Sequence, residues 1–526
     1  MEFKKYKKVL SYDLIGIQQE GILINSKAIK VLKLLTNDEF KQFGKFINSP
    51  FFNSNKSLNK LYLFLKKHYP LFEFTAEDAF KFLFPGKKFY IAKIRQLFAE
   101  IYKLWEDFLA YNSLSADSFA KKYYIIKELD KHKLDNLFLT NVKKLEEELN
   151  NSKIGDDLYR KRVELENAII DFHLMRNNRH KIQYNILGRG EYYMNSIMNW
   201  LHLQNSDVLA NELDYGKINE PNIAAAFISN INLVSFSGWL NENMCPQFTY
   251  TAIFCNLLLM HLHFENESYY FKSKNLILDN FDLFDNNMKK ALILTLRNYC
   301  NIKCHILFKK EKFELDKIMY QFAKTNFFDF GIFFAPIFYL NTIRNALALG
   351  EIQWTEKFIN DFTKYIHDDE RENNQNLALA FLAFKKSEFE ESLKYLNQIK
   401  LTTPTIKPFF KMLILQVYYE LDMIEPGLSA IDSMHHFINN TKELGNRIKQ
   451  MFQSQLNIIN EFYKLKIQNE KIDDIEISKL KDDIEKAPFP IKSWFYEKVK
   501  ELESKVASKN QGTYSRTLSP SKISVN

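Results

Sequence analysis

Three consecutive segments between Asn345 and Asn440 share one layout, in which an apolar helix, a short polar turn and a second amphipathic helix follow one another. After each turn comes an apolar residue, and a small residue follows three positions later: Ile352 and Thr355, Phe389 and Ser392, Ile424 and Gly427. The small residues lie 37 and then 35 positions apart, and periods in this range indicate stacked helical hairpins. We therefore expect each small residue to mark a place where a neighbouring helix comes close.

The second helices keep the helical period beyond these residues, as in Ile352, Thr355, Ile359, Phe362 and Ile366. Gly350 precedes the first of them and is suited to end a first helix in the left-handed backbone conformation. These features predict helices that pack through one face and are joined by tight turns.

The units resemble the tetratricopeptide repeat family, and the second unit matches best because Pro404 falls where that family closes its second helix. Tyr418 falls where the family has a tyrosine late in the first helix. The other units depart from both features, with His367 and Asn439 at the proline position and Ala346 and Ala383 at the tyrosine position. The resemblance implies a superhelical stack whose first helices line a concave face.

The order of features along the chain also resembles an uncharacterised bacterial family of helical proteins that end in such repeats. Trp354, in the segment GEIQWTEKFI, and the later segment RENNQNLALAFLAF carry this similarity. The resemblance implies a fold and no particular activity.

Composition supports an all-α fold for the whole chain. The 526 residues include only 14 Gly and 12 Pro, where average usage would give roughly 37 and 26. Few helix breakers combined with long apolar-periodic segments predict a helical-hairpin array, or α-solenoid, with an N-terminal helical block. We expect six segments: an extension at 1–25, the helical block at 26–112, a central array at 115–325, the repeat region at 327–466, C-terminal helices at 467–503 and a disordered tail at 504–526.

Local signals place several boundaries within these segments. Thr36 with Glu39 forms a capping-box pattern, and Thr75 opens a short helix that stops at Pro85. Gly188-Arg189-Gly190 is expected to break the chain, because two glycines in three residues disfavour a helix interior.

The charge balance is weakly basic. Formal net charge is +8, from 72 Lys and Arg against 64 Asp and Glu, and only 11 of the 72 are Arg. Proteins that bind nucleic acid commonly use Arg for bidentate contacts to bases. The excess of positive charge here comes from Lys, so we favour its interpretation as an ordinary solvated surface. A helix corner near Pro85 could nevertheless form a helix-turn-helix whose basic residues face phosphates: Lys87, Lys88, Lys93 and Arg95. The alternative is an ordinary packed corner, which we favour because the turn lacks a base-reading Arg, Asn or Gln cluster.

No motif for catalysis, metal or cofactor binding is assembled in the sequence. All four cysteines lie between 245 and 304, and Cys300 and Cys304 share a helix face, but no second pair with zinc-site spacing accompanies them. Buried cysteine is common in helical cores, and this is the interpretation we favour. The chain also has no HExxH, Walker loop, GxSxG, EF-hand loop or GxGxxG. We expect a protein that is not an enzyme and that has no cofactor.

The cellular compartment is predicted from the lack of disulfide, signal-peptide and membrane-span patterns in the sequence. Four cysteines in so long a chain argue against a disulfide scaffold, and the first residues lack a signal-peptide apolar core. No apolar run approaches the length of a membrane span. We expect a cytoplasmic protein that does not associate with a membrane.

The function that these features favour is a non-catalytic scaffold or adaptor that binds a protein or peptide in its concave groove. The alternative is nucleic-acid binding through the basic corner and tail. Alignment of the units places seven residues on the groove: Asn341, Arg344, Phe381, Phe384, Gln416, Tyr419 and Glu420. Another part of the same chain could also fill the groove, and the sequence leaves both possibilities open.

Overall fold

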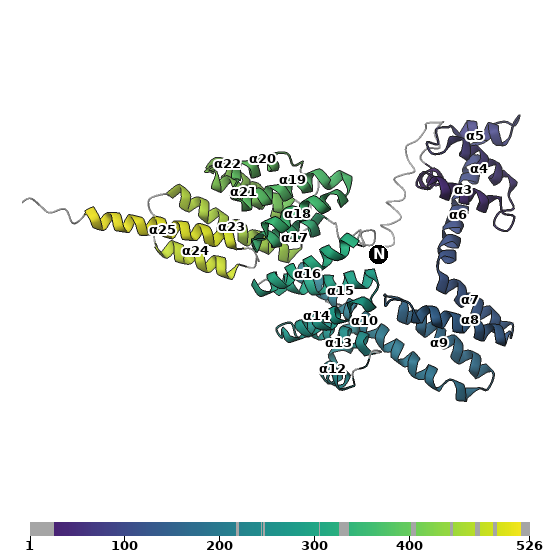
Figure 1. The fold of residues 1–526 in the computed structure, drawn as a ribbon. Coiled ribbons are helices and arrows are strands. Elements are labelled where there is room, and N and C mark those ends of the chain that lie inside the picture. Colours follow the sequence, from purple (N-terminus) through teal and green to yellow (C-terminus); the bar gives the residue numbers. More distant parts are fainter. Residues whose placement is uncertain are drawn as a thin grey trace, which may run out of the picture. The chain divides into compact units, whose positions relative to one another are not determined.

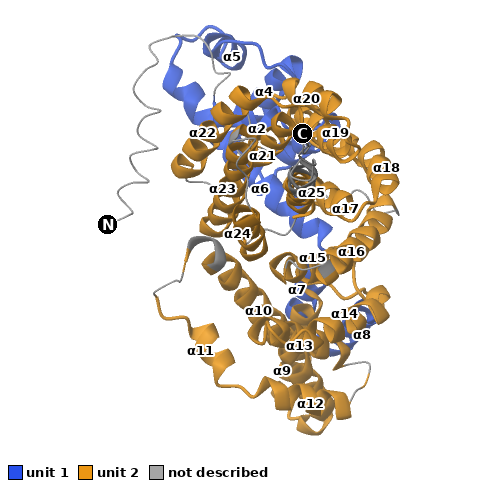
Figure 2. Ribbon diagram, turned by 90° about the vertical axis from the view of Figure 1, so that its left-hand side faces the viewer, with its two compact units in different colours: residues 1–150 blue, residues 151–526 orange. Residues whose placement is uncertain are grey.

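The computed structural model describes residues 26–216, 220–243, 245, 248–303, 306–325, 336–400, 407–441, 445–468, 474–487 and 492–516. These residues form 24 α-helices and no strand, so the predicted all-α fold is confirmed (Figure 1). The chain divides into two compact units, Met1–Asn150 and Asn151–Asn526, which Figure 2 colours separately.

Unit 1 is built from seven described helices. Its core is rich in phenylalanine, with Phe43, Phe72 and Leu65 fully buried among α2 to α6, and α7 and α8 form a hairpin beyond it. The helices are α2 (Lys27–Leu32), α3 (Asn37–Asn48), α4 (Lys56–His68), α5 (Ala76–Leu83), α6 (Ile91–Ala116), α7 (Ser118–Lys131) and α8 (Asp135–Asn150).

Two helix starts in unit 1 follow the predicted capping patterns. The hydroxyl of Thr36 accepts a hydrogen bond from the Glu39 amide, while the Glu39 carboxylate accepts one from the Thr36 amide at 2.7 Å. Thr75 and Asp78 make the same reciprocal pair at the start of α5. Each pair satisfies backbone donors that a helix N-terminus leaves without partners.

Unit 2 contains the other seventeen described helices around one continuous apolar core. Consecutive helices pack as antiparallel pairs throughout most of the unit. They are α9 (Leu158–Met175), α10 (Gln183–Tyr215), α11 (Ile223–Ser229), α12 (Leu233–Glu242), α13 (Thr249–Leu262), α14 (Ser268–Asp279), α15 (Asn286–Lys303), α16 (Ile306–Thr325), α17 (Pro336–Ala348), α18 (Ile352–Phe362), α19 (Asp368–Lys385), α20 (Phe389–Asn397), α21 (Lys407–Glu420), α22 (Ile424–Asn440), α23 (Asn446–Gln468), α24 (Asp474–Lys486) and α25 (Ser493–Arg516).

The predicted break at Gly188-Arg189-Gly190 is wrong, because α10 continues through all three residues. Each glycine in a helix interior costs about 1 kcal/mol relative to alanine. Tertiary packing offsets that cost, since α10 packs against α9 along one side and against the almost fully buried α13 along another. Arg189 contributes to the α9 contact by donating a hydrogen bond to the side chain of Asn167 at 2.9 Å.

Three helix pairs, α17–α18, α19–α20 and α21–α22, are joined by turns with the same backbone geometry. Gly350, Ser387 and Asp422 each adopt a left-handed conformation, with φ of 83°, 62° and 59°. In every turn the amide of the next residue donates to a carbonyl five positions earlier, on Ala346, Ala383 and Tyr418 respectively, at 2.9–3.0 Å. This arrangement is the Schellman motif, which satisfies carbonyls left free at a helix C-terminus. The expected left-handed end at Gly350 is confirmed.

All three small residues are buried, and Ser392 and Gly427 lie where another helix comes close, as the sequence predicts. Thr355 and Ser392 are fully buried, and the Ser392 hydroxyl donates to the carbonyl of Ala380 in the preceding helix at 2.9 Å. A Cβ atom on Gly427 would lie 2.2 Å from the ring of Tyr463 in α23. The first helices in turn pack on one another, α17 on α19, α19 on α21 and α21 on α23.

Three expected boundaries differ from the described structure. Helix α6 runs past 112 to Ala116, and the first compact unit ends at Asn150, so the α7–α8 hairpin belongs with unit 1. Helix α25 extends to Arg516, so the boundary expected at 504 lies inside a helix. The expected extension at 1–25 and Pro404 lie outside the described residues.

Replacing Gly427 by alanine should destabilise unit 2 by about 1–3 kcal/mol, because the added methyl group overlaps the packed Tyr463 ring. The Tyr463 hydroxyl is held by the Leu415 carbonyl at 2.8 Å, which limits how far the ring can move. Thermal unfolding followed by circular dichroism measures the effect. The matched control is Gly190→Ala, which meets no atom within 4 Å and should raise stability by roughly 0.5–1 kcal/mol. Equal melting temperatures for Gly427→Ala and wild type would contradict this packing.

Candidate functional site

The first helices of the repeat units line a cavity of about 510 Å³. Helices α17, α19, α21 and α23 supply one side, and the start of α25 supplies the other. Figure 2 shows α25 end-on, surrounded by these helices. Aromatic and aliphatic residues make up about half of the lining, and polar or charged residues make up the rest; they include Arg344, Phe381, Phe384, Lys385, Phe409, Gln416, Glu420, Phe452, Gln455, Trp494, Phe495, Glu497, Lys498 and Glu501.

Five of the seven predicted groove residues line this cavity, namely Arg344, Phe381, Phe384, Gln416 and Glu420. Asn341 lies half-buried on α17 and is not part of the lining. Tyr419 is buried beneath α25, where its ring packs against those of Trp494 and Phe462 at centroid distances of 5.6 and 6.0 Å. Adjacent residues on a helix point in directions about 100° apart, so Tyr419 and Glu420 cannot both face the groove.

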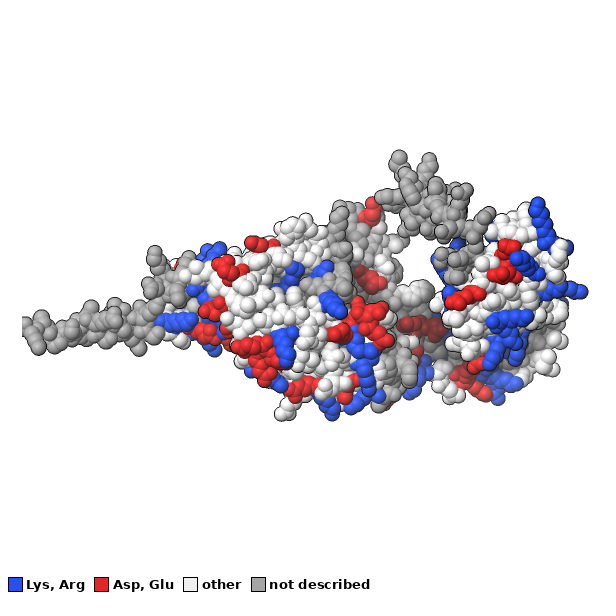
Figure 3. Space-filling model, turned by 90° about the horizontal axis from the view of Figure 1, so that it is seen from above, with Lys and Arg blue, Asp and Glu red and all other residues white. Residues whose placement is uncertain are grey.

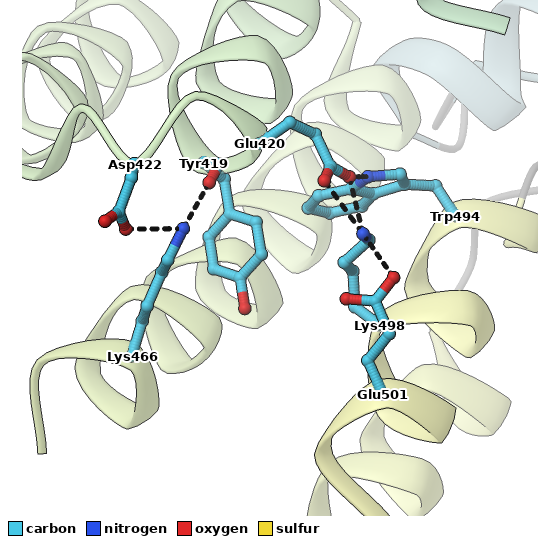
Figure 4. Close-up of polar contacts among 7 residues, drawn as sticks. All are labelled: Tyr419, Glu420, Asp422, Lys466, Trp494, Lys498 and Glu501. Atoms are coloured by element: carbon cyan, nitrogen blue, oxygen red, sulfur yellow. Dashed lines mark hydrogen bonds and ion pairs between the residues drawn. The ribbon is translucent and has the colours of Figure 1, made fainter. Parts of the chain in front are cut away.

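An ionic contact fixes α25 to α21 at one end of the cavity. Figure 4 shows the Lys498 ammonium between the carboxylates of Glu420 and Glu501, at 2.8 and 2.6 Å. The indole N–H of Trp494 also donates to Glu420, at 2.5 Å. The Lys498 and Glu420 side chains are only 8% and 10% exposed, so water competes little for either partner.

The charge state of Lys498 is set by two opposing effects. Burial favours the neutral amine, but hydrogen bonds and attraction from Glu420 and Glu501 outweigh it, so the pKa of Lys498 lies above its ordinary value. Lys498 is therefore protonated at neutral pH. A charged pair held out of water is costly to break because the remaining partner is left without compensation.

A second contact lies beside the first and links α21 to α23. Lys466 pairs with Asp422 at 2.8 Å and donates to the carbonyl of Tyr419 at 2.5 Å (Figure 4). The Lys466 hydrogen bond holds the pKa of the exposed Asp422 carboxyl below its ordinary value. The carbonyl contact also satisfies a backbone acceptor at the end of α21.

The prediction from the sequence therefore did not include the residues of α25 that line the cavity. A signal for it was present, because Trp494, Lys498 and Glu501 recur at intervals of four and three on one helix face. The partner of that face could not be read from spacing, since Glu420 is 78 residues from Lys498 in the chain.

Arg344 differs from these paired charges. Its guanidinium lies over the rings of Phe381 and Phe409, at 5.8 and 4.7 Å from their centroids. Within the described ranges no carboxylate forms an ion pair with it. Burial lowers the pKa of Arg344 to about 10, so the group remains charged at neutral pH. Cation–π contact compensates part of its lost hydration.

Two glutamine side chains in the cavity wall also lack hydrogen-bond partners among the described residues: Gln416, which is half-buried, and Gln455, which is 6% exposed. The amide atoms of both residues remain accessible from the cavity, so water can pair with them in the free protein. Both amides can pair with groups that enter the cavity.

The cysteines and histidines are not brought into a reactive arrangement. Burial raises the pKa of Cys255 and Cys300 to about 12, so both thiols are neutral. His202 and His261 stack at 5.3 Å, and burial lowers their pKa values to about 3 and about 4. In the part of the chain that the structure describes, no three His, Cys, Asp or Glu residues are grouped to hold a metal ion, and Cys304 lies outside that part.

A buried ionic cluster joins α15 and α16. Asp316 pairs with Arg297 at 2.5 Å and with Lys312 at 2.9 Å, and all three side chains are nearly inaccessible to water. The guanidinium also lies over the ring of Phe338 at 4.0 Å. These contacts close the cluster to ligands and give it a structural role.

No described helix alone is long and apolar enough to cross a membrane, although α11 and α12, bent by 61° at a short break, reach the required length and apolarity together.

Comparison with known proteins does not add a family: no family model matches the chain, and no curated protein or solved structure shows significant similarity to it. The class that the described residues define is a large all-helical protein with consecutive helix-pair packing.

Replacing Lys498 by methionine should loosen α25 from α21, because Glu420 would keep a buried charge without its cation. The expected loss is about 3 kcal/mol. Limited digestion with subtilisin should release the segment after residue 492 faster than in wild type. Lys500→Met is the matched control, since Lys500 is exposed on the same helix. Equal digestion rates for the two variants would contradict a stabilising role for Lys498.

Proposed function

We propose that this protein is a non-catalytic, cytoplasmic scaffold that binds a protein or peptide partner on the concave side of its C-terminal helix pairs. The observation that carries the proposal is the cavity beside α25, where Arg344, Gln416 and Gln455 form no ion pair and no hydrogen bond with the described residues. These groups are accessible from the cavity, so the polar atoms of a bound partner can pair with them. The aromatic rings around them supply apolar contact area for a partner.

We further propose that the three pairs α17–α18, α19–α20 and α21–α22 are repeats of the tetratricopeptide type. Their shared turn geometry, their buried small residues and their period support this assignment. Proteins built in this way present a concave surface to ligands. In this chain α25 already covers one end of that surface.

Affinity purification followed by quantitative mass spectrometry tests the scaffold proposal. An Arg344→Glu, Phe384→Ala double variant should lose the partner, because it reverses the cavity's unpaired charge and removes an aromatic contact. Tyr419 is unsuitable for this test because its ring is buried in the core. Lys357→Glu, on the exposed side of α18, is the charge-matched control. A set of partners that is identical for wild type and both variants would exclude the groove as the binding surface.

A second candidate function is nucleic-acid binding by unit 1. Residues 26–112 contain 15 Lys and Arg against 8 Asp and Glu, a net charge of +7. Lys87, Lys88 and Arg95 are exposed there, and no described acidic side chain pairs with them. Figure 3 shows Lys and Arg side chains scattered over the visible face of unit 1, with Asp and Glu side chains among them. Such a surface is suited to contact phosphates.

Gel-shift measurements with double-stranded DNA and with RNA test this candidate. Binding at low salt should weaken steeply as salt rises, because contacts to phosphates release counterions. A Lys87→Glu, Lys88→Glu, Arg95→Glu variant should reduce the salt dependence and the affinity together. If neither nucleic acid shows a gel shift at low salt, nucleic-acid binding by unit 1 is excluded.

A further inference from the structure

The cavity beside α25 has two chemically different ends. At the α21–α25 end, Glu420 and Glu501 share the single cation of Lys498, and Glu497 also lines the wall, so this end carries a net negative charge. At the α17–α19 end, Arg344 and Lys385 both line the wall, and neither forms an ion pair with a described carboxylate. The free positive charge therefore lies at one end only.

Apolar surface lies directly around the free charge. The rings of Phe381 and Phe409 flank the Arg344 guanidinium, and Phe384 lines the same wall. These rings shield the charge from water, which strengthens its attraction for an anion. A planar guanidinium also matches a carboxylate through two parallel hydrogen bonds.

The side-chain amides of Gln416 and Gln455 are a third feature of the cavity, beside the free charge and the apolar surface. Gln455 is only 6% exposed as a residue, but its amide atoms still reach the cavity surface, where they make no hydrogen bond to a described residue. Each amide offers a donor and an acceptor. Together they can pair with the polar groups of a ligand whose carboxylate lies on Arg344.

We propose that this cavity binds an apolar carboxylate, with its carboxyl group on Arg344, its apolar body against Phe381, Phe384 and Phe409, and its remaining polar atoms on Gln416 and Gln455. The inference rests on the proposed scaffold function and names the chemistry of the partner. A protein presents this chemistry as an acidic residue between apolar ones, and a free aromatic acid presents it as a small molecule. A volume of about 510 Å³ accommodates either.

Isothermal calorimetry on the full chain distinguishes these sources. Three probes are used: an acetylated and amidated peptide with Phe-Glu-Phe at its centre, the same peptide with Phe-Gln-Phe, and phenylbutanoate. The blocked termini leave the glutamate as the peptide's only carboxylate. The Phe-Glu-Phe peptide should bind more tightly than the Phe-Gln-Phe peptide, because only the first can form an ion pair with Arg344.

Arg344→Gln should lower affinity for the carboxylate probe about ten-fold or more and leave the Phe-Gln-Phe peptide unaffected. Gln455→Leu replaces the side chain by one of similar size. It should weaken binding of the peptides without changing the preference for the Phe-Glu-Phe peptide over the Phe-Gln-Phe peptide. Arg95→Gln, in the other unit, is the control for a change of net charge. Circular dichroism of each variant verifies that it is folded.

The outcomes separate this inference from the scaffold proposal. Arg344-dependent binding of the Phe-Glu-Phe peptide supports both. Arg344-dependent binding of phenylbutanoate alone supports the carboxylate site and counts against a protein partner in this groove. Failure of both carboxylate probes at millimolar concentration, or binding that Arg344→Gln leaves unchanged, overturns the carboxylate site. In that case the affinity purification still decides the scaffold proposal on its own.

Discussion

Helix pairing in the C-terminal part of the chain depends on a left-handed residue at the end of each first helix. The turns at Gly350, Ser387 and Asp422 share one backbone conformation and hydrogen-bond pattern, and successive first helices pack side by side. The small residues three positions into the second helices allow the close approach that follows, as Gly427 does beneath Tyr463. Without these two constraints the first helices could not form one continuous wall, and the cavity on that wall would not exist.

Helix α25 limits which part of this wall is accessible to a partner. It covers the α21 end and is held there by the buried ion pair of Lys498 with Glu420, to which the Trp494 indole also donates. At the α17–α19 end, Arg344 and Lys385 line the wall and form no ion pair with a described carboxylate. Of the two possibilities left open by the sequence, filling by the same chain is observed for the portion that α25 lines, and binding of a partner at the other portion is our proposal. This division leads us to place the partner at Arg344 and not at Glu420.

The helical class, the period and the small residues could be predicted because they follow from local rules. Apolar spacing identifies amphipathic helices, and a small residue at a fixed place in a repeat indicates close packing. Capping at Thr36 and Thr75 is equally local, because donor and acceptor lie three residues apart. Five groove residues were found for the same reason, since they recur on the inward face of each first helix.

Features that depend on long-range packing were missed. The continuous α10 requires support from α9 and α13, which outweighs the low helix propensity of its two glycines. Ser387 and Asp422 adopt the left-handed conformation although neither is glycine, and only comparison with Gly350 reveals the shared turn. The contact of Lys498 with Glu420 joins residues that no periodicity relates.

The central claim is that α25 is packed into the concave wall of the repeats in the free protein, leaving only the Arg344 end open. Amide hydrogen exchange of the full chain, read by mass spectrometry, tests it directly. Peptides covering Trp494–Leu502 should be protected to a degree similar to those from the buried helix α21. Exchange of the α25 peptides at the rate of an unstructured chain, while α21 stays protected, would show that the groove is open along its whole length and would contradict this account.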